Sequence, residues 1–466
     1  MSGDKLQINA EFESNDLGDA RLDRRLLSIV DALTRHPEAS FPAALGSTAE
    51  VEAFYRLLRN EQLTYKKVTQ SHRDTTAARC AEFKEVLVIH DWTEFNWSCN
   101  DDYLRENLSR LSKQRQGFYG HCSIACSADG LRVPLGTIGM KTYVHKKQST
   151  EKCQEFWNKI SPACESEGEH WMEGIKAAEK SIGDKTAVIH VCDREADKLR
   201  IFRGLRDGSH RYVIRLTNRK HRTMNKLAIV DLLEKQPFIG KRVVNLSPRS
   251  LQGVPQRSRT QPERVRRSAL MSFRAVAVSL NVDDKPFDVN VVEAIERKPP
   301  SGDKPVRWLL ITSEPASTMK QVLRVVDIYR SRWLVEEYFK AIKTGCAYRK
   351  RQLDSASTLL IALALCEPIA WRLLALRHLD RSELPMPASA ILNEVQLLLL
   401  KHEAPNIGWS LEPTVHDVTR ALMEMSGYHR SKGPPGWMTL GRSFEKLLNM
   451  ELGARVAVKS RLVIND

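Results

Sequence analysis

The chain has 466 residues, of which 42% are apolar and 28% are charged, a balance that indicates a folded protein rather than a disordered one. At about 100 to 200 residues per domain, this length predicts roughly two to four domains. The net charge of +15, with a pI near 9.4, favours a polyanionic partner such as nucleic acid, because Lys and Arg release counterions from phosphate groups. The alternative is a protein that is merely basic and soluble.

Cysteine usage and the N-terminal sequence both favour a cytoplasmic location. The nine cysteines are scattered and never form a Cys-x-x-Cys pair, which argues for reduced thiols and against a disulfide framework or a zinc knuckle. Residues 1–19 lack a basic start followed by an apolar run, so we expect no signal peptide. The most apolar stretch, 359–376, contains Glu367, Pro368 and Arg372, which favours a buried helix over a membrane span. We therefore expect a cytoplasmic protein without membrane association.

Short helices are predicted between about residues 16 and 67. Apolar residues recur at helical spacing over 19–36, and a second helix opens at Ser47 and Thr48 with Glu50 in its first turn. Five arginines on these helices either contact phosphate or form ion pairs on a solvated face. They are Arg21, Arg24, Arg25, Arg56 and Arg59.

Strand signals begin at residue 85 and alternate with helical ones. Apolar runs over 85–91 and 187–193 each end in an aspartate, and a hairpin turning at Asp129 and Gly130 lies between them. A polar helix over about 151–180 and a further strand at 211–216 complete the order β, β, β, α, β, α, β. This order predicts an α/β sheet with central strands buried on both faces and the hairpin at its edge.

The character of the sequence changes from about residue 217 to 304, where turns rich in Pro, Ser and Gly separate short alternating strands. The stretch 249–274 holds seven arginines against one acid, Glu263. We interpret the whole segment as a β-rich insertion with a basic mobile loop, for which simple solvation is the alternative.

The rest of the chain is predicted to be helical. One helix runs from about residue 318 to 344, the apolar helix follows, and a boundary is plausible near Asp380. A stripe on the last helix is more typical of a core than of a partner surface. It consists of Trp437, Leu440, Phe444, Leu447 and Leu448.

Two aspartates are candidates for chemistry because each follows a predicted buried strand. Asp91 and Asp193 stand where an open α/β sheet places its ligand-binding groups. A buried aspartate needs a cation or a hydrogen-bonding loop. For either residue alone, an aspartate that caps a strand in a turn is an equally simple interpretation.

A third carboxylate lies on the helix over 318–344. At 100° per residue, five functional side chains fall on a stripe about 80° wide. They are Tyr329, Arg332, Glu336, Lys340 and Lys343. Glu337 lies off this stripe, which favours Glu336 as the site carboxylate. A surface helix with a Glu336 to Lys340 ion pair is the alternative.

Together, Asp91, Asp193 and Glu336 could bind two magnesium ions about 3.5 to 4 Å apart, an arrangement that activates water at a phosphodiester. Ligands that are all oxygen favour Mg²⁺, with Mn²⁺ as a substitute, over zinc. Arg332, Lys340 and Lys343 would hold the phosphates.

The stretch 187–199 contains two further acids beside Asp193. Asp193 is the predicted metal ligand because it is the first polar residue after the buried strand. Arg194, Glu195 and Asp197 are expected to begin the next helix, where acids are favoured by the helix dipole and need no catalytic role. Glu195 could still orient neighbouring basic groups.

Two stretches carry a family resemblance. "VCDREAD" (191–197) and "DIYRSRWLVEEYFKAIKTG" (327–345) resemble the second-aspartate segment and the Y-x2-R-x3-E-x6-K signature of the bacterial DDE transposases of insertion-sequence family four. The similarity in layout spans nearly the whole chain. It implies an RNase H-like catalytic core with the β-rich insertion, flanked by helical N-terminal and C-terminal domains.

The resemblance also implies boundaries and partners. It places a DNA-binding domain for transposon ends at 1–70, the catalytic domain at 71–378 with its insertion at about 217–304, and a helical dimerisation domain at 379–466. A homodimer would pair two transposon ends in a synaptic complex on double-stranded DNA and join them to target DNA. The protein would act in the bacterial cytoplasm, associated with the nucleoid.

The resemblance implies roles for single residues as well. Asp91, Asp193 and Glu336 take the place of the metal-binding triad. Tyr329, Arg332, Lys343 and Arg215 match residues near the terminal and hairpin phosphates. Trp308 and Trp333 match aromatic residues that accommodate a flipped base, for which core packing of Trp308 is the alternative. Trp92, directly after Asp91, departs from the small polar residue that is more frequent in the family.

The resemblance implies that the reaction is cut-and-paste transposition. In that family water attacks first, the freed 3′-hydroxyl forms a hairpin on the opposite strand, the hairpin is reopened, and the 3′ end is joined to target DNA. One alternative is a DNA-binding regulator or domesticated transposase that no longer cuts, which the three intact acids disfavour. Another is a related RNase H-like nuclease without strand transfer.

Overall fold

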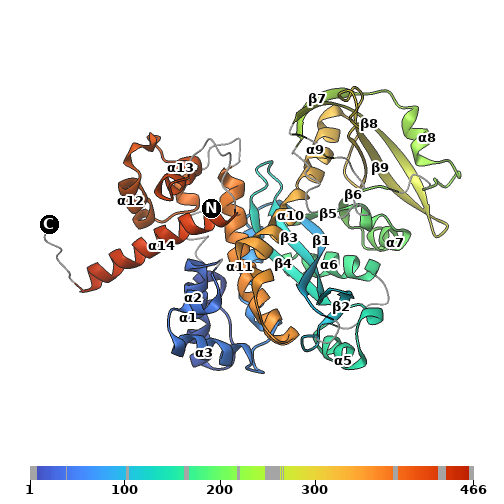
Figure 1. Ribbon diagram of the computed structural model, residues 1–466. Coiled ribbons are helices and arrows are strands. Elements are labelled where there is room, and N and C mark those ends of the chain that lie inside the picture. Colours follow the sequence, from blue (N-terminus) through green and yellow to red (C-terminus); the bar gives the residue numbers. More distant parts are fainter. Residues whose placement is uncertain are drawn as a thin grey trace.

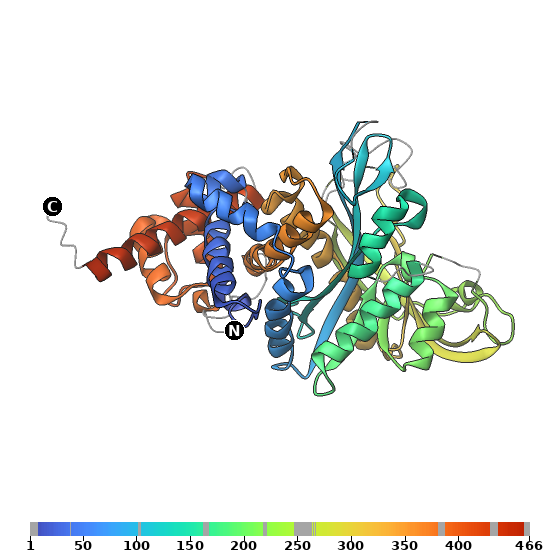
Figure 2. The same cartoon turned by 90° about the horizontal axis from the view of Figure 1, so that it is seen from below.

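The computed structural model describes most of the chain. The described residues are 8–37, 39–100, 104–161, 167–217, 221–246, 263, 265, 267–380, 387–428 and 437–460. Helices at the two ends of the chain lie together on one side, and the sheet with its extension lies on the other (Figures 1 and 2).

The N-terminal part is helical, as predicted. Asp19 caps α1, accepting a hydrogen bond from the Arg21 backbone N–H at 2.7 Å, and Ser47 caps α3 in the same way. Leu26, Val30 and Phe54 are buried on their inner faces. The bounds are α1 Ala20–Arg35, α2 Phe41–Leu45, α3 Thr48–Leu58 and α4 Tyr65–Cys80.

One mixed sheet of ten strands forms the centre of the molecule. Its order is β2-β3-β1-β5-β6-β10-β9-β8-β7, and β4 pairs with β3 at the edge, which confirms the predicted hairpin. The first strands are β1 Glu85–Ser98, β2 Ser109–Ser112, β3 Arg115–Ser127, β4 Pro134–Tyr143, β5 Ala187–Cys192 and β6 Arg211–Arg215.

Strand β1 is longer than predicted, so Asp91 does not follow the strand but lies inside it. Its parallel pairing with β5 ends at His90 and Cys192, whereas its antiparallel pairing with β3 continues from Asp91 to Ser98. The polar residues beyond Asp91 are tolerated in the strand because only one neighbour remains there.

Helices cover both faces of the sheet. Helix α6 packs on β1, β3 and β4, while α9 contacts β5 and β6 and α10 contacts β1 from the other side. The single polar helix predicted over 151–180 is wrong, because two helices lie there, α5 Glu151–Ile160 and α6 Glu167–Ile182. Helix α7, Leu199–Asp207, precedes β6.

The β-rich insertion extends the same sheet. Strand β9 pairs with β10, β8 with β9, and β7 with β8. Most of the basic loop predicted over 249–274 lies outside the described residues, apart from 263, 265 and the start of β8. The bounds are α8 Ile229–Glu234, β7 Gly240–Leu246, β8 Arg267–Val282, β9 Lys285–Glu296 and β10 Arg307–Thr312.

The helix predicted over 318–344 is interrupted. It divides into α9 Met319–Arg330, which begins with a capping box of Thr318 and Gln321, and α10 Trp333–Lys340. Alpha-helical geometry then gives way to a π-helical turn over Ala341–Gly345. The stripe of five side chains was calculated for one regular helix and is therefore only approximate. Each irregularity changes the direction in which the following side chains project.

Helix α11, Ala356–Asp380, is the buried apolar helix that the sequence predicts. It is long and apolar enough to cross a membrane over Ala356–His378, and its most apolar window is entirely buried inside the structure.

The C-terminal part is helical, with α12 Glu394–Glu403, α13 Val415–Met425 and α14 Trp437–Ser460. Leu440, Phe444 and Leu447 of α14 are buried, so this part of the predicted stripe is core. The Trp437 side chain lies outside the described part of the chain. The eight cysteines that the structure describes are unpaired thiols.

Candidate active site

The two aspartates lie side by side because of strand register. His90 and Cys192 form the last pair of the parallel ladder between β1 and β5. Asp91 and Asp193 are the next residues of these two neighbouring segments. Neighbouring strands run about 4.8 Å apart. Both side chains project on the face opposite to His90, which is the face that α9 and α10 cover.

Arg332 links the third carboxylate to this pair. Its Nη1 lies 3.1 Å from Oδ2 of Asp91, and its Nη2 donates to Oε1 of Glu336. The pairing of Glu336 with Lys340, proposed as the surface alternative, is not formed. Glu336 therefore faces the strand ends, one turn along from Arg332.

The three acids lie close enough for their charges to act on one another. Burial, the nearby Asp193 charge and the Glu336 charge together raise the pKa of Asp91 to about 7, against the opposing effect of Arg332. Tyr329 and then the carboxylates of Glu336 and Asp91 hold the pKa of Arg332 above its usual value, although burial acts to lower it.

The acids beside Asp193 have other partners. Oδ1 of Asp193 accepts from the Glu195 backbone N–H at 2.7 Å, which fixes the carboxylate at the start of a short 3₁₀ turn, Arg194–Ala196. The helix expected to start with these acids begins only at Leu199. Oδ1 of Asp197 is 2.5 Å from Nε2 of His221, so Asp197 anchors the segment after β6.

Glu195 does not orient a basic group, as had been considered, but accepts a hydrogen bond from the Trp92 indole N–H. The Trp92 backbone N–H in turn donates to Oδ1 of Asp91 at 2.8 Å. The residue that departs from the family pattern thus ties the Asp91 strand to the turn after Asp193.

Tyr329 and Arg215 lie at the same site. Burial raises the pKa of the Tyr329 hydroxyl, while the charges of Arg332 and Arg215 and a hydrogen bond with Arg215 act in the opposite direction. Trp308 packs partly buried against the core, with its ring 6.3 Å from that of Tyr329. Trp333 is 53% exposed, and its ring lies 5.5 Å from the Arg332 guanidinium carbon.

The two lysines of the predicted stripe differ. Lys343 donates to Oγ1 of Thr93 on β1, and burial lowers its pKa to about 8, with the nearby Arg349 acting in the same direction. Lys340 instead points away, 55% exposed and 2.8 Å from Oε1 of Glu337. The structure therefore brings Lys343 to the carboxylates and does not bring Lys340 there.

The predicted arginines of the N-terminal helices form a separate surface. All five are exposed, and none forms an ion pair within the described part of the chain. They lie on α1 and α3 and do not contact the carboxylates. They are Arg21, Arg24, Arg25, Arg56 and Arg59.

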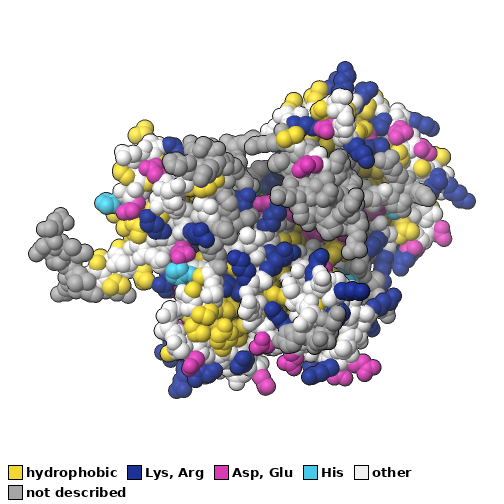
Figure 3. Space-filling model, viewed as in Figure 1, with side chains coloured by type: hydrophobic (Ala, Val, Ile, Leu, Met, Phe, Trp, Pro, Cys, Tyr) yellow, Lys and Arg dark blue, Asp and Glu magenta, His cyan; other side chains and the backbone are white. Residues whose placement is uncertain are grey.

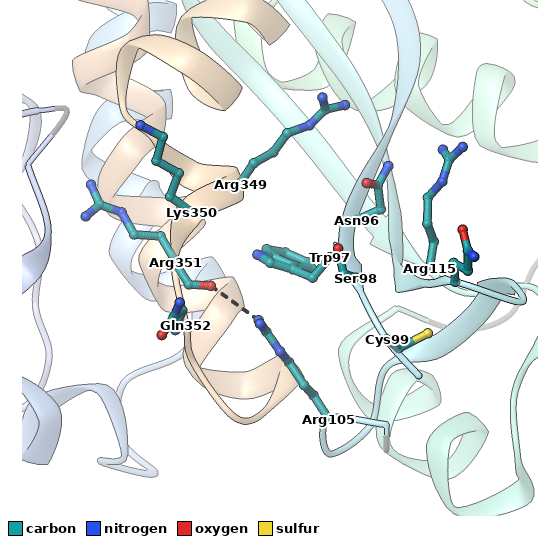
Figure 4. A pocket seen from close by; sticks show the side chains of 11 residues that line it. Asn96, Trp97, Ser98, Cys99, Arg105, Arg115, Arg349, Lys350, Arg351 and Gln352 are labelled. Carbon is teal, nitrogen blue, oxygen red and sulfur yellow. Dashed lines mark hydrogen bonds between the residues drawn. The ribbon is translucent and has the colours of Figure 1, made fainter. Parts of the chain in front are cut away.

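A basic pocket of about 1040 Å³, which the sequence analysis did not identify, lies further along β1 (Figure 4). One wall is Asn96 to Cys99, and the other is the segment after the π-helical turn, with Arg349 and Lys350 exposed. The Arg351 guanidinium turns away from the pocket and donates to the Ala39 carbonyl at 2.6 Å. The run of basic residues over 349–351 was the feature of the sequence that could have indicated this pocket.

Figure 3 shows further Lys and Arg side chains around α11.

The donor set suits a divalent cation. Asp91, Asp193 and Glu336 offer only oxygen atoms, which Mg²⁺ and Mn²⁺ prefer. Their mutual repulsion, which raises the pKa of Asp91, is relieved by added positive charge. These three residues could therefore hold one or two such ions.

Two protein-family models match the chain. "Transposase DNA-binding" matches residues 6–63, which include the exposed arginines of α1 and α3. "Transposase DDE domain" matches residues 167–366, which include Asp193 and Glu336, while Asp91 lies outside both matches. The mixed α/β sheet with its covering helices is consistent with such a domain. The chain therefore contains a transposase DNA-binding domain and a DDE transposase domain, the composition of a DNA-binding DDE transposase.

Proposed function

We propose that this protein carries out cut-and-paste DNA transposition as a member of insertion-sequence family four, similar to the transposase of transposon five. The observation that carries the proposal is the Arg332 guanidinium between Asp91 and Glu336, beside Asp193. A protein that only binds DNA has no need for three converging acids. We further propose an RNase H-like core and bacterial cytoplasmic localisation at the nucleoid.

The acids would act as metal ligands. Asp91, Asp193 and Glu336 would hold two Mg²⁺ ions in the active complex, with Mn²⁺ as a substitute. When bound, the metal would supply Lewis acidity and lower the pKa of the attacking water or hydroxyl. Arg332 compensates the acids before metal and DNA arrive, and then becomes available to a phosphate.

Other residues would hold the DNA end. Tyr329, Arg215 and Lys343 surround the acids and would bind the phosphates next to the cleaved bond, whereas the exposed Lys340 would contact DNA only further out. Hydrolysis forms a bond from water oxygen to phosphorus and releases the 3′-hydroxyl. That hydroxyl would then attack a phosphodiester of the opposite strand, which forms a hairpin and releases the flanking DNA. Water would reopen the hairpin by hydrolysis, and the regenerated 3′-hydroxyl would attack a target phosphodiester and displace a 3′-hydroxyl of the target strand.

Trp333 and Trp308 differ in how accessible their rings are to a flipped base. The exposed ring of Trp333, next to Arg332, offers a stacking surface that a base can reach. Trp308 is partly buried and packs near the Tyr329 ring, so it would support Tyr329. A base could stack on Trp308 only if the end of β10 moved when DNA binds.

Binding and assembly would use the outer parts of the chain. The N-terminal arginines would contact transposon ends, and the basic pocket beside β1 would hold the phosphate backbone of the duplex. Exposed apolar side chains on α12 and α14, including Leu398, Leu452 and Val456, support a homodimer in a synaptic complex on paired ends.

The test is cleavage of a duplex that carries the inverted repeats flanking the gene. Asp193→Asn and Glu336→Gln should abolish Mg²⁺-dependent nicking and hairpin formation on a denaturing gel, while binding in a gel-shift assay persists. Glu337→Gln is the matched control, because this adjacent acid pairs with Lys340 instead of facing the site.

Cleavage that survives in either site variant would overturn the proposal. Binding without any cleavage by the wild-type protein would instead favour the non-cutting regulator. Nicking without hairpins or strand transfer would favour a related nuclease.

A further inference from the structure

A second group of metal-ligating side chains lies on the other face of the sheet. Glu179 projects from the last turn of α6, His190 from the middle of β5, and His210 from the residue before β6. One ligand atom from each lies within 4.8 Å of the other two. His190 shares the sheet face of His90, opposite to the face of Asp91 and Asp193.

The three side chains converge on one point. Oε1 of Glu179 lies 3.1 Å from Nε2 of His190 and 2.8 Å from Nδ1 of His210. Four-coordinate zinc, with bonds of about 2.0 to 2.2 Å, holds its ligand atoms about 3.3 Å apart. An outward shift of a few tenths of an ångström would admit the ion.

The imidazoles are held in position by their surroundings. Nδ1 of His190 lies 2.9 Å from Nε2 of His90, and Nδ1 of His90 lies 2.9 Å from Oγ of Ser123. Nε2 of His90 can accept a hydrogen bond from Nδ1–H of His190, which leaves the Nε2 lone pair of His190 for a metal. The His210 ring is fixed against the Gly208 backbone, where a Cβ atom would come within 2.1 Å of Nε2.

We propose that Glu179, His190 and His210 form a binding site for Zn²⁺. Two imidazole nitrogens and one carboxylate select a zinc-like ion over Mg²⁺. The Glu179 side chain is 35% exposed, so the ion can enter from solvent and take water as its fourth ligand. Bound zinc would link α6 to β5 and to the residue before β6. It would lie on the face of β5 opposite to the Asp193 side chain. The site does not depend on the proposed transposition.

The experiment measures zinc in the full-length protein. After chelator treatment and dialysis, titration with Zn²⁺ should give one equivalent per chain, and excess Mg²⁺ should not displace it. Co²⁺ should give the visible absorption of a four-coordinate site. Glu179→Gln and His210→Gln should each weaken Zn²⁺ binding by at least about tenfold, as expected on loss of a ligand.

Three controls make the result specific. His402→Gln changes an 85% exposed histidine and should retain one zinc. Asp193→Asn should also retain it, which separates this site from the carboxylates on the opposite face. Circular dichroism and thermal melting in chelator establish that the ligand variants fold.

Absence of a stoichiometric zinc in the wild-type protein would overturn the proposal and leave a purely hydrogen-bonded network. Zinc that stays undiminished in both folded ligand variants would overturn it as well.

Discussion

Arg332 determines how three acids coexist in the folded protein. Its guanidinium contacts Asp91 and Glu336, and its side chain is largely buried. Without this cation the pKa of Asp91 would rise further, because Arg332 opposes the effects of burial and of Asp193. The arginine therefore occupies the place for which the proposed divalent cation would compete.

Arg332→Met should destabilise the protein without divalent ions by about 2 kcal/mol, because two partly buried acids lose their shared partner. Added Mn²⁺ should raise the melting temperature of this variant more than that of the wild type, since the ion replaces the missing charge. Arg203→Met, which removes an exposed pair with Asp283, is the control and should not alter the response to Mn²⁺. An equal Mn²⁺ response in all three proteins would contradict the assignment.

The sequence favoured Asp193 among the acids at 187–199 for a physical reason, and in the structure this residue lies beside Asp91. A residue directly after a buried strand has a fixed direction, and Asp193 lies beside Asp91 for that reason. The partners of Glu195 and Asp197 could not be predicted, because Trp92 and His221 lie in other segments. Long-range side-chain hydrogen bonds leave no periodic pattern in one sequence.

Buried Glu367 on α11 predicts a pH effect on stability. Burial raises its pKa to about 7 from an ordinary value of 4.5, and the Tyr65 hydroxyl donates to Oε1. Below pH 4.5 the carboxyl is neutral in both states. Between pH 4.5 and 7 the folded protein keeps a proton that the unfolded chain releases, so stability falls as the pH rises through this window.

Glu367→Gln should remove this loss, because the amide is neutral at every pH. Relative to wild type, the variant should gain about 2 to 3 kcal/mol in unfolding free energy between pH 5 and pH 8. Denaturant unfolding of both proteins at the two pH values measures this difference. The exposed Glu412→Gln is the control and should follow the wild type. A constant difference between Glu367→Gln and wild type would contradict the argument.

Helix and strand irregularities decide which side chains reach the site. The sequence predicted a strand at 85–91 and one helix over about 318–344, but not that β1 continues past Asp91 or that the helix breaks before Trp333. The continuation of β1 follows its pairing with β3, and α10 with the π-helical turn packs against α11. Both are tertiary contacts, which apolar patterning does not encode. The π-helical turn then directs Lys343 to Thr93.

The two lysines on this segment therefore predict different results. Lys343→Met should reduce single-turnover nicking by about 10- to 100-fold, because it removes a positive charge that lies beside the acids in a partly buried site. Lys340→Met should stay within about twofold, since its exposed pair with Glu337 contributes little. Comparable losses in the two variants would favour the regular helical stripe over the interrupted one.

At the scale of the whole molecule, positive charge is divided between separate surfaces. The N-terminal helices lie against α11 and α14, away from the carboxylates, whereas the basic pocket lies beside β1 (Figure 1). Composition predicted a polyanionic partner, but a net charge carries no information about where cations gather. Only the fold shows that the five exposed arginines of the N-terminal helices, which form no ion pair within the described residues, lie apart from Arg349 and Lys350 at the pocket.

This division predicts how salt affects DNA binding. Each phosphate contact releases about 0.9 counterions, so Arg24→Gln, Arg56→Gln and their combination should lower the slope of log K against log salt by about 0.9 per lost contact. Fluorescence anisotropy with the inverted-repeat duplex at several salt concentrations measures the slope. Arg203→Gln, on α7 at the opposite side of the sheet, should leave it unchanged. If the double variant keeps the wild-type slope, the arginines of α1 and α3 are a solvated face, and the phosphate contacts belong to the pocket beside β1.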